Sequence, residues 1–309
     1  MTQEDFLRQW HDGKNYITAH TSGSTGIPKE IRLLKSDMLA SARATNRFFQ
    51  LRDDSVYLCP LSLDYIAGKM MAVRAIESGG TAVFIEPSNS PAFSPCDLLA
   101  IVPSQVEALL NSPELSNISN IIIGGAPLSD EMRNALVKSG ANAYESYGMT
   151  ETCSHIALRH VSEKHFRTMP GIRISTDDRG CLVADIPNMS IGCVITNDLV
   201  ELSSPTAFRW IGRYDNIINS GGIKIIPEQL ESEIQDTLKD TAFSDTPFCI
   251  SSRPDPKWGR RVVMLIEGSP ETAESIAHII SSIDSIHRPK EVIAVHALPR
   301  TANGKIRRL

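Results

Sequence analysis

This sequence lacks several features that would place it in a specialised class of protein. No apolar run approaches the roughly 18 residues that a membrane-spanning helix needs. The first twenty residues carry acidic side chains and no apolar core, unlike a secretory signal. Positive charge is not in excess, since the net charge is −5 and the pI is near 5.9, so neither nucleic acid nor a membrane is expected as a partner. We therefore expect a cytoplasmic protein without a membrane span.

Cysteine is present but shows no pattern. The six cysteines are scattered and none forms a C-x-x-C pair. In a chain of this length without an export signal, we expect free thiols rather than a disulfide framework. Apolar residues make up 41% and charged residues 22%, which is ordinary for a globular protein. The 309 residues suffice for one large and one small domain.

Strand-like and helix-like segments alternate through the first half of the chain. The strand-like segments are short, apolar and bounded by Gly, Pro or Ser: 81–85, 98–102 and 121–123. The helix-like segments carry apolar residues at helical spacing: 35–49, 67–78, 104–110 and 129–139. This alternation predicts a layered α/β domain with a substantially parallel sheet.

From about Ile172 the pattern changes to short strands with turns between them. The expected strands are 180–183, 192–196, 199–202 and 208–211. Beyond Asp215, helices are expected at 228–238 and 272–283, and strands at 248–251 and 261–266. We therefore predict a large domain over residues 1–213 and a separate small α+β domain over residues 214–309.

The segment 21–30 concentrates hydroxyls, glycines and a lysine, which suits a polyphosphate. Its candidate ligand-binding residues are Thr21, Ser22, Gly23, Ser24, Thr25, Gly26 and Lys29. The spacing is not that of a Walker A loop, and an isolated stretch of this kind is more often a solvated linker. Strand-like residues 16–19 and 31–34 flank it, however, and predict a glycine hairpin.

The motif T-S-G-S-T-G-x-P-K-E resembles the phosphate loop of the adenylate-forming superfamily, which includes acyl-CoA synthetases, adenylation domains and luciferases. Tyr147-Gly148-Met149-Thr150-Glu151 matches the same family's aromatic-Gly-x-Thr-Glu motif. The resemblance implies that Tyr147 borders adenine, Thr150 contacts the α-phosphate and Glu151 binds Mg²⁺, a cation that prefers oxygen ligands. Gly125, Ala126 and Pro127 are expected to form the other wall of the adenine pocket.

Further family motifs follow toward the end of the chain. Asp198, in Thr-Asn-Asp where the family usually has Thr-Gly-Asp, is expected to bind ribose, and Asn197 is expected to preserve a left-handed turn. Arg213 adds a ribose or phosphate contact, and Asp215 stands at the family's hinge position. Gly221 and Gly222 resemble the loop that reaches the pantetheine tunnel of coenzyme A.

Lys305 ends the motif P-x-x-x-x-G-K. By resemblance it bridges the substrate carboxylate and the α-phosphate, where a fixed ammonium stabilises developing negative charge. The implied substrates are ATP, a small carboxylic acid and coenzyme A, with Mg²⁺, and the implied catalytic residues are Lys305, Thr150 and Glu151.

Within the superfamily, the segments 58–71, 102–105 and 147–155 look most like those of o-succinylbenzoate–CoA ligases of menaquinone biosynthesis. The candidate polar groups of an acyl pocket are Tyr65, Ser154, His155 and Arg159, because a dicarboxylate needs a second anchor. Two alternatives remain open: another acyl- or aryl-CoA ligase or carrier-protein-loading enzyme, and a non-catalytic nucleotide-binding homologue.

The chain departs from the family in one large respect. Only twenty residues precede the phosphate loop, where the family usually has a longer subdomain. The amphipathic start at Phe6, Leu7 and Trp10 favours a shortened chain over a cut fragment. The core left open by the missing subdomain must be covered, and a homodimer is one candidate for that cover.

Overall fold

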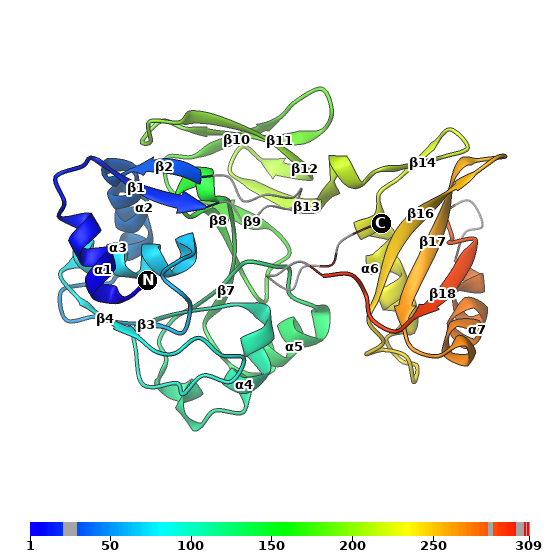
Figure 1. The fold of residues 1–309 in the computed structure, drawn as a ribbon, viewed down its shortest axis with the longest axis horizontal. Helices are drawn as coiled ribbons and strands as arrows, with labels where there is room; N and C mark the ends of the chain where they lie inside the picture. The colour runs from blue at the N-terminus through cyan, green and yellow to red at the C-terminus, as the bar shows by residue number, and fades with distance from the viewer. Residues whose placement is uncertain (21–29, 284–286, 301–305, 307, 309) are drawn as a thin grey trace. The chain divides into compact units, whose positions relative to one another are not determined.

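The computed structural model describes residues 1–20, 30–283, 287–300, 306 and 308. The chain divides into two compact units (Figure 1). The first comprises Met1–Ser175, Val183–Val194 and Leu202–Arg209, and the second comprises Thr176–Leu182, Ile195–Glu201 and Trp210–Leu309. The sequence-based domain boundary after residue 213 stays a prediction.

Seven α-helices occur in the described part of the chain: α1 (Gln3–Trp10), α2 (Lys35–Phe48), α3 (Ile66–Ser78), α4 (Val106–Leu110), α5 (Asp130–Ser139), α6 (Pro227–Leu238) and α7 (Pro270–Ile279). Short 3₁₀ turns include η1 (Pro103–Gln105), η2 (Pro113–Asn117), η3 (Thr150–Thr152), η4 (Tyr214–Asn216) and η5 (Ile280–Ser282). The hydroxyls of Thr2, Ser129 and Ser269 accept hydrogen bonds from the first turns of α1, α5 and α7, as good N-caps do. Among these helices, none is long and apolar enough to cross a membrane.

The strands are β1 (Tyr16–His20), β2 (Glu30–Leu34), β3 (Val56–Cys59), β4 (Thr81–Phe84), β5 (Leu98–Ile101), β6 (Ile121–Ile123), β7 (Ala143–Gly148), β8 (His155–His160), β9 (Phe166–Thr168), β10 (Arg173–Thr176), β11 (Cys181–Ile186), β12 (Gly192–Ser204), β13 (Ala207–Arg213), β14 (Ile218–Ser220), β15 (Ile223–Ile225), β16 (Phe248–Asp255), β17 (Gly259–Glu267) and β18 (Glu291–Val295). The predicted hairpin around residues 21–29 is confirmed by the antiparallel pairing of β1 with β2.

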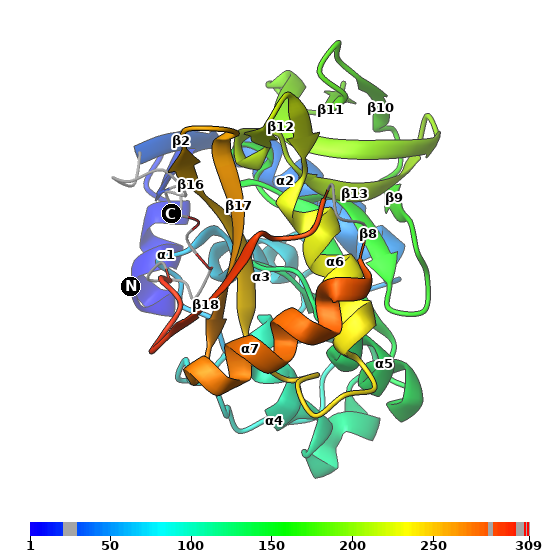
Figure 2. The same cartoon turned by 90° about the vertical axis from the view of Figure 1, so that its right-hand side faces the viewer.

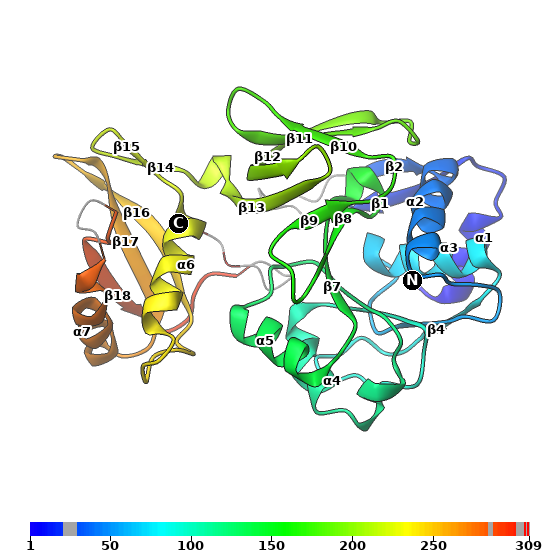
Figure 3. The same cartoon turned by 180° about the vertical axis from the view of Figure 1, so that it is seen from behind.

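The largest sheet has the strand order β10-β11-β12-β13-β9-β8-β7-β6-β5-β3-β4. Strands β4, β3, β5, β6 and β7 are parallel, and β7, β8 and β9 are antiparallel. The predicted α/β class with a substantially parallel sheet is therefore confirmed. Beside this sheet, α2 contacts α3 and α4 contacts α5, as Figure 3 shows from behind.

Apolar strands and helix faces form the core of the first unit. Leu58, Leu99, Ile121 and Leu136 are fully buried. The N-terminal helix α1 is amphipathic as expected, since it buries Phe6 and Trp10 in a second cluster with residues of β1, α2 and α3.

The second unit contains a three-stranded sheet. Strands β16 and β17 are antiparallel, and β18 pairs with β17 in parallel. Helix α6 contacts β16 and α7 contacts β18, so both helices pack against this sheet (Figure 2). Ile234, Ile250, Met264 and Ile276 are fully buried between these layers, as expected of a small α+β domain.

One local prediction is wrong. Two short strands separated by a left-handed turn at Thr196-Asn197-Asp198 were expected, but Gly192–Ser204 is a single strand. Among the described residues other than glycine, only Gln50 and Cys153 have positive φ, so Asn197 is not left-handed. Alternating burial explains the continuity, because Val194, Thr196 and Asp198 are all buried on one face. Seven further strands of the described chain were not predicted: β3, β8, β9, β10, β14, β15 and β18.

Candidate functional site

The predicted site residues occur in both units. The phosphate-loop residues Thr21, Ser22, Gly23, Ser24, Thr25, Gly26 and Lys29 lie outside the described residues, as does Lys305. Their roles stay predictions.

In the first unit, the carboxyl ends of β6 and β7 lie side by side, with Ile123 opposite Glu145. A Cβ on Gly124 would lie 2.5 Å from the Ser146 hydroxyl, and Gly125 has φ +88°. Both glycines are therefore required by the backbone and by crowding from β7. This parallel pairing brings Gly125, and with it Ala126 and Pro127, to the same sheet edge as Tyr147.

Tyr147 and Gly148 end strand β7. The Tyr147 ring packs edge-on against Phe208, with centroids 5.1 Å apart. The pairing of β7 with β8 shifts register between Tyr147 and Gly148. A Cβ on Gly148 would lie only 2.3 Å from the carbonyl oxygen of Ser154. Glycine is therefore required at this position by the close approach of the protein's own backbone.

Thr150 and Glu151 lie in the 3₁₀ turn η3, which begins after Met149. The Thr152 hydroxyl bonds both the backbone N–H of Met149, at 3.1 Å, and the Met149 carbonyl, at 2.9 Å. Glu151 is exposed and Thr150 is half-buried. The described residues contain no group of three or more His, Cys, Asp or Glu side chains that could enclose a metal. A single exposed carboxylate suits Mg²⁺ shared with nucleotide phosphates.

A polar group missed by the sequence analysis is centred on Arg74 of α3. The side chain is 3% exposed, and its Nη2 donates to Ser154 Oγ at 2.6 Å while Nη1 faces the sulfur of Met71 at 3.4 Å. Its Nε has no hydrogen-bond partner in the described part of the chain, and no ion pair to a described carboxylate involves it. Burial lowers the pKa of Arg74 to about 10. An arginine within the apolar helical run 70–76 was the available signal.

His155 lies against this group at the start of β8. Its Nε2 is 3.2 Å from the Thr45 hydroxyl and its Nδ1 is 3.3 Å from Ser154 Oγ. Burial, reinforced by the positive charge of Arg74, holds the pKa of His155 well below its usual value. The ring is therefore neutral near pH 7. Ser154 and His155, both predicted as acyl-pocket residues, thus lie together with Arg74 directly after the Tyr147–Glu151 motif.

The other two acyl-pocket candidates lie in different surroundings. Arg159 donates to Glu145 at 2.8 Å and stacks on Phe166 at 4.5 Å, so its charge is already paired. Tyr65 precedes α3 and is 51% exposed. Among the described residues, neither side chain forms a hydrogen bond or ion pair with Arg74, Ser154 or His155, and their role in acyl binding stays a prediction.

In the second unit, Asp198 is 8% exposed. Its Oδ1 accepts from the Trp210 indole N–H at 3.2 Å and from Arg213 at 3.4 Å. Arg213 also donates to Asp215 at 2.7 Å. The structure thus brings together the predicted ribose, phosphate and hinge residues, and Trp210 is an additional member.

Asn197 also belongs to this group. Its amide donates to both carboxylate oxygens of Asp215, at 3.0 and 3.1 Å, and its carbonyl oxygen accepts from Arg179 at 2.8 Å. The side chain that replaces the family's usual glycine therefore contacts the predicted hinge residue directly.

Gly221 and Gly222 form the turn between β14 and β15, with φ of +58° and +84°. A Cβ on Gly221 would lie 2.6 Å from the Trp258 ring, and its N–H donates to the Trp258 carbonyl at 2.8 Å. The packing therefore joins the β14–β15 turn to Trp258, which lies 37 residues further along the chain.

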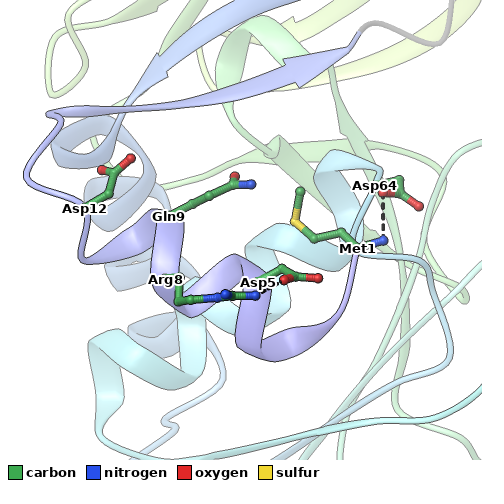
Figure 4. A pocket seen from close by; sticks show the side chains of 6 residues that line it. All are labelled: Met1, Asp5, Arg8, Gln9, Asp12 and Asp64. Atoms are coloured by element: carbon green, nitrogen blue, oxygen red, sulfur yellow. Dashed lines mark hydrogen bonds and ion pairs between the residues drawn. The ribbon is translucent and has the colours of Figure 1, made fainter.

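A hollow of about 550 Å³ occurs beside α1, and its lining residues are labelled in Figure 4. None of them is a predicted site residue. Its carboxylates have internal partners: Asp5 pairs with Arg8, Asp12 with Lys35, and Asp64 with the amino group of Met1. We assign no function to it.

Comparison with known proteins identifies the family. The model of the AMP-binding enzyme family matches residues 8–186, and that of the AMP-binding enzyme C-terminal domain matches residues 248–305. A 2-succinylbenzoate–CoA ligase of Listeria monocytogenes is 24% identical over 341 aligned positions, covering 99% of this chain and 71% of that protein.

Many solved structures resemble this one. An AMP-forming acyl-CoA synthetase/AMP-acid ligase II-like protein from Dyadobacter fermentans is 34% identical, with a TM-score of 0.64, covering 98% of this chain and 90% of that one. The o-succinylbenzoate CoA synthetase of Bacillus subtilis, solved with its acyl-adenylate, is 22% identical with a TM-score of 0.78. The match covers 94% of this chain and 67% of that one. It has also been solved with ATP and a magnesium ion. The chain therefore belongs to the family of AMP-binding enzymes and is of the AMP-forming acyl-CoA synthetase type.

Proposed function

We propose that this chain is an ATP-dependent carboxylate–CoA ligase whose acid is o-succinylbenzoate, so that it acts in menaquinone biosynthesis. The names of curated relatives support this substrate. The observation that carries the proposal is the buried guanidinium of Arg74 beside Ser154 and His155. A buried charge without an ionic partner is costly, so this group is suited to receive a carboxylate from a ligand.

The substrate has two carboxylates with different tasks. One attacks the α-phosphorus of ATP, the bond to the pyrophosphate oxygen breaks, and an acyl-AMP remains. The other is not consumed and needs an anchor, which Arg74 provides through charge-assisted hydrogen bonds. Neutral His155 donates or accepts a hydrogen bond without adding charge.

The remaining candidates are assigned to the nucleotide. Tyr147 and residues 125–127 border adenine, Asp198 and Arg213 contact ribose, and Thr150 contacts the α-phosphate. Glu151 and the phosphate oxygens hold Mg²⁺, which neutralises charge on the phosphates when bound. Lys305 stabilises the charge that develops as the carboxylate attacks.

The second half-reaction uses coenzyme A as the acceptor. Its sulfur attacks the acyl carbonyl, AMP leaves, and the thiol proton passes to solvent. We assign the turn at Gly221 and Gly222 to the approach of the pantetheine arm, and Asp215 to the hinge at which the small domain turns between the two half-reactions. Neither step needs a side-chain nucleophile, because positioning supplies most of the rate enhancement.

Pyrophosphate release with Mg·ATP tests this function. We expect release with o-succinylbenzoate, and a CoA ester when coenzyme A is added, with Lys305→Ala as the inactive control. Benzoate, a fatty acid and an amino acid are the competing substrates. Pyrophosphate release with one of these acids alone would reject o-succinylbenzoate as the substrate. No release with any acid, although ATP binds, would favour a nucleotide-binding homologue without activity.

Arg74→Met tests the anchor itself. Losing a charge-assisted hydrogen bond costs about 1.5–3 kcal/mol, so we expect the KM for o-succinylbenzoate to rise about 10- to 100-fold. Benzoate has no second carboxylate, so the KM for any turnover of benzoate should not rise in Arg74→Met. Arg43→Met, at an exposed arginine of α2 paired with Glu77, is the matched control. An equal loss for both acids would contradict the anchoring role.

A further inference from the structure

Arg308 is tied firmly to the body of the second unit. Its Nη2 donates to Glu231 Oε2 at 2.7 Å, and its Nη1 donates to Glu231 Oε1 and, at 2.8 Å, to the carbonyl oxygen of Ile250. It also lies 3.3 Å from Glu228. One guanidinium therefore connects α6 to β16, in the forked geometry that suits arginine and not lysine.

The surroundings of Arg308 make this contact stronger than a surface ion pair. The side chains of Arg308, Glu228 and Glu231 are 20%, 10% and 22% exposed. Burial disfavours the charged guanidinium, but the hydrogen bonds and charge of Glu231, with Glu228, outweigh it and raise the pKa of Arg308. Partly buried, bidentate pairs lose less to solvent screening than exposed ones.

The chain is also anchored before this point. Leu298 is 3% exposed in a cluster with Cys249, Val263 and Leu265, and its N–H donates to Glu267 at 2.8 Å. Arg300 pairs with Ile306 in an antiparallel bridge. Residues 301–305, which include Lys305, fall between these two anchored ends in the sequence.

The carboxylate of Glu228 has a second contact that concerns the hinge. Asn216, the residue after Asp215, donates its amide to Glu228 Oε1, the same oxygen that faces Arg308. The 3₁₀ turn η4 and the last described residue of the chain therefore share one acceptor on α6.

We propose that Arg308 is a positioning residue for the first half-reaction. Its pairing with Glu231 and Glu228 fixes the chain to the second unit three residues after Lys305, and adenylation, the step assigned to that lysine, depends on this anchor. This inference rests on the proposed function. It assigns no contact with substrate to Arg308, which acts through the lysine three residues before it.

Measuring the two half-reactions separately distinguishes a positioning role of Arg308 in adenylation from a general role in stability. For Arg308→Gln and Glu231→Gln, we expect ATP–pyrophosphate exchange to fall about 10- to 100-fold, because a misplacement of about 1 Å can cost that much. Thioester formation from added acyl-adenylate and coenzyme A does not use Lys305, and we expect it to stay within about twofold of wild type. Arg308→Lys keeps the charge without the fork, and its exchange rate should be intermediate.

Arg253→Gln is the matched control. This arginine lies in the same unit, is 53% exposed, and is 3.9 Å from Glu291, so neither half-reaction should change. Thermal unfolding of each variant checks that the unit is folded. Limited trypsin digestion provides a measurement that is independent of activity. Loss of the anchor should speed cleavage after Lys305, and mass spectrometry measures the rate of that cleavage.

Equal loss of both half-reactions in folded Arg308→Lys would overturn the positioning role, as would unchanged exchange and unchanged cleavage in Arg308→Gln. The proposed function is judged separately. If wild-type protein gives neither half-reaction with any acid, that function fails, whereas loss of exchange in Lys305→Ala but not in Arg308→Gln rejects this inference alone.

Discussion

At the scale of single residues, burial determines the protonation of the groups around Arg74. His155 is 7% exposed, and its ring lies between two hydroxyls and beside the guanidinium. A protonated ring at this position would face Arg74 without a counter-ion among the described residues. The folded protein therefore favours the neutral imidazole, whereas the unfolded chain protonates near its ordinary pKa.

This difference predicts a loss of stability in acid. Because the pKa of His155 is lower in the folded state, its contribution is complete above the unfolded pKa of about 6.5 and declines as the pH falls below it, by at most about 1.4 kcal/mol per pH unit. Urea denaturation at about pH 7.5 and about pH 5.5 measures the decline. His155→Gln should reduce this decline, whereas His11→Gln, at an exposed histidine, should not. An unchanged pH dependence in His155→Gln would contradict the assignment.

At the scale of elements, strand β12 shows how a side chain can replace a turn. Asn197 is within a continuous strand and uses its amide to contact Asp215 of η4. The motif suggested a glycine-like bend at this position, yet the backbone is extended and the polar side chain makes the connection. Arg179 stacks over Tyr214 at 5.2 Å and supports the same turn.

Substitution of Asn197 distinguishes an extended strand residue from a left-handed turn residue at this position. In a strand interior, glycine costs roughly 0.5–1 kcal/mol relative to alanine, so Asn197→Gly should be less stable than Asn197→Ala by about that amount. A left-handed turn would give the opposite order, since glycine is then the preferred residue. Chemical denaturation of both variants and wild type decides between them.

At the scale of the whole molecule, the six cysteines are all free thiols, as expected from their spacing. Five are buried and Cys193 is exposed. Burial raises the pKa of Cys59, Cys96 and Cys153 to about 12. Their thiolates, which are the reactive form, are therefore scarce at neutral pH.

A thiol reagent should therefore distinguish one cysteine from the others. We expect the native protein to react rapidly with one equivalent of reagent and the unfolded protein with six, since only Cys193 is exposed among the six cysteines. Cys193→Ser should abolish the rapid phase. Several rapid equivalents in native protein would show that the buried clusters open readily.

Much of the fold follows from local patterns. The strands 16–19 and 121–123 and the helix after Ser129 were predicted close to their observed bounds, because alternation, helical periodicity and an N-cap are properties of neighbouring residues. Strand β18 was not predicted, since its five half-buried residues show no alternation. The expected cytoplasmic location and homodimer stay predictions.

The sequence by itself determined the α/β class and the family, because both rest on short motifs and on periodicity that survive without knowledge of contacts. Only the tertiary structure decided which charges lie together. Arg74 meets Ser154 across 80 residues of chain, and Arg308 meets Glu231 across 77. Such pairs depend on how strands and helices pack, and a single sequence contains no local pattern that sets them.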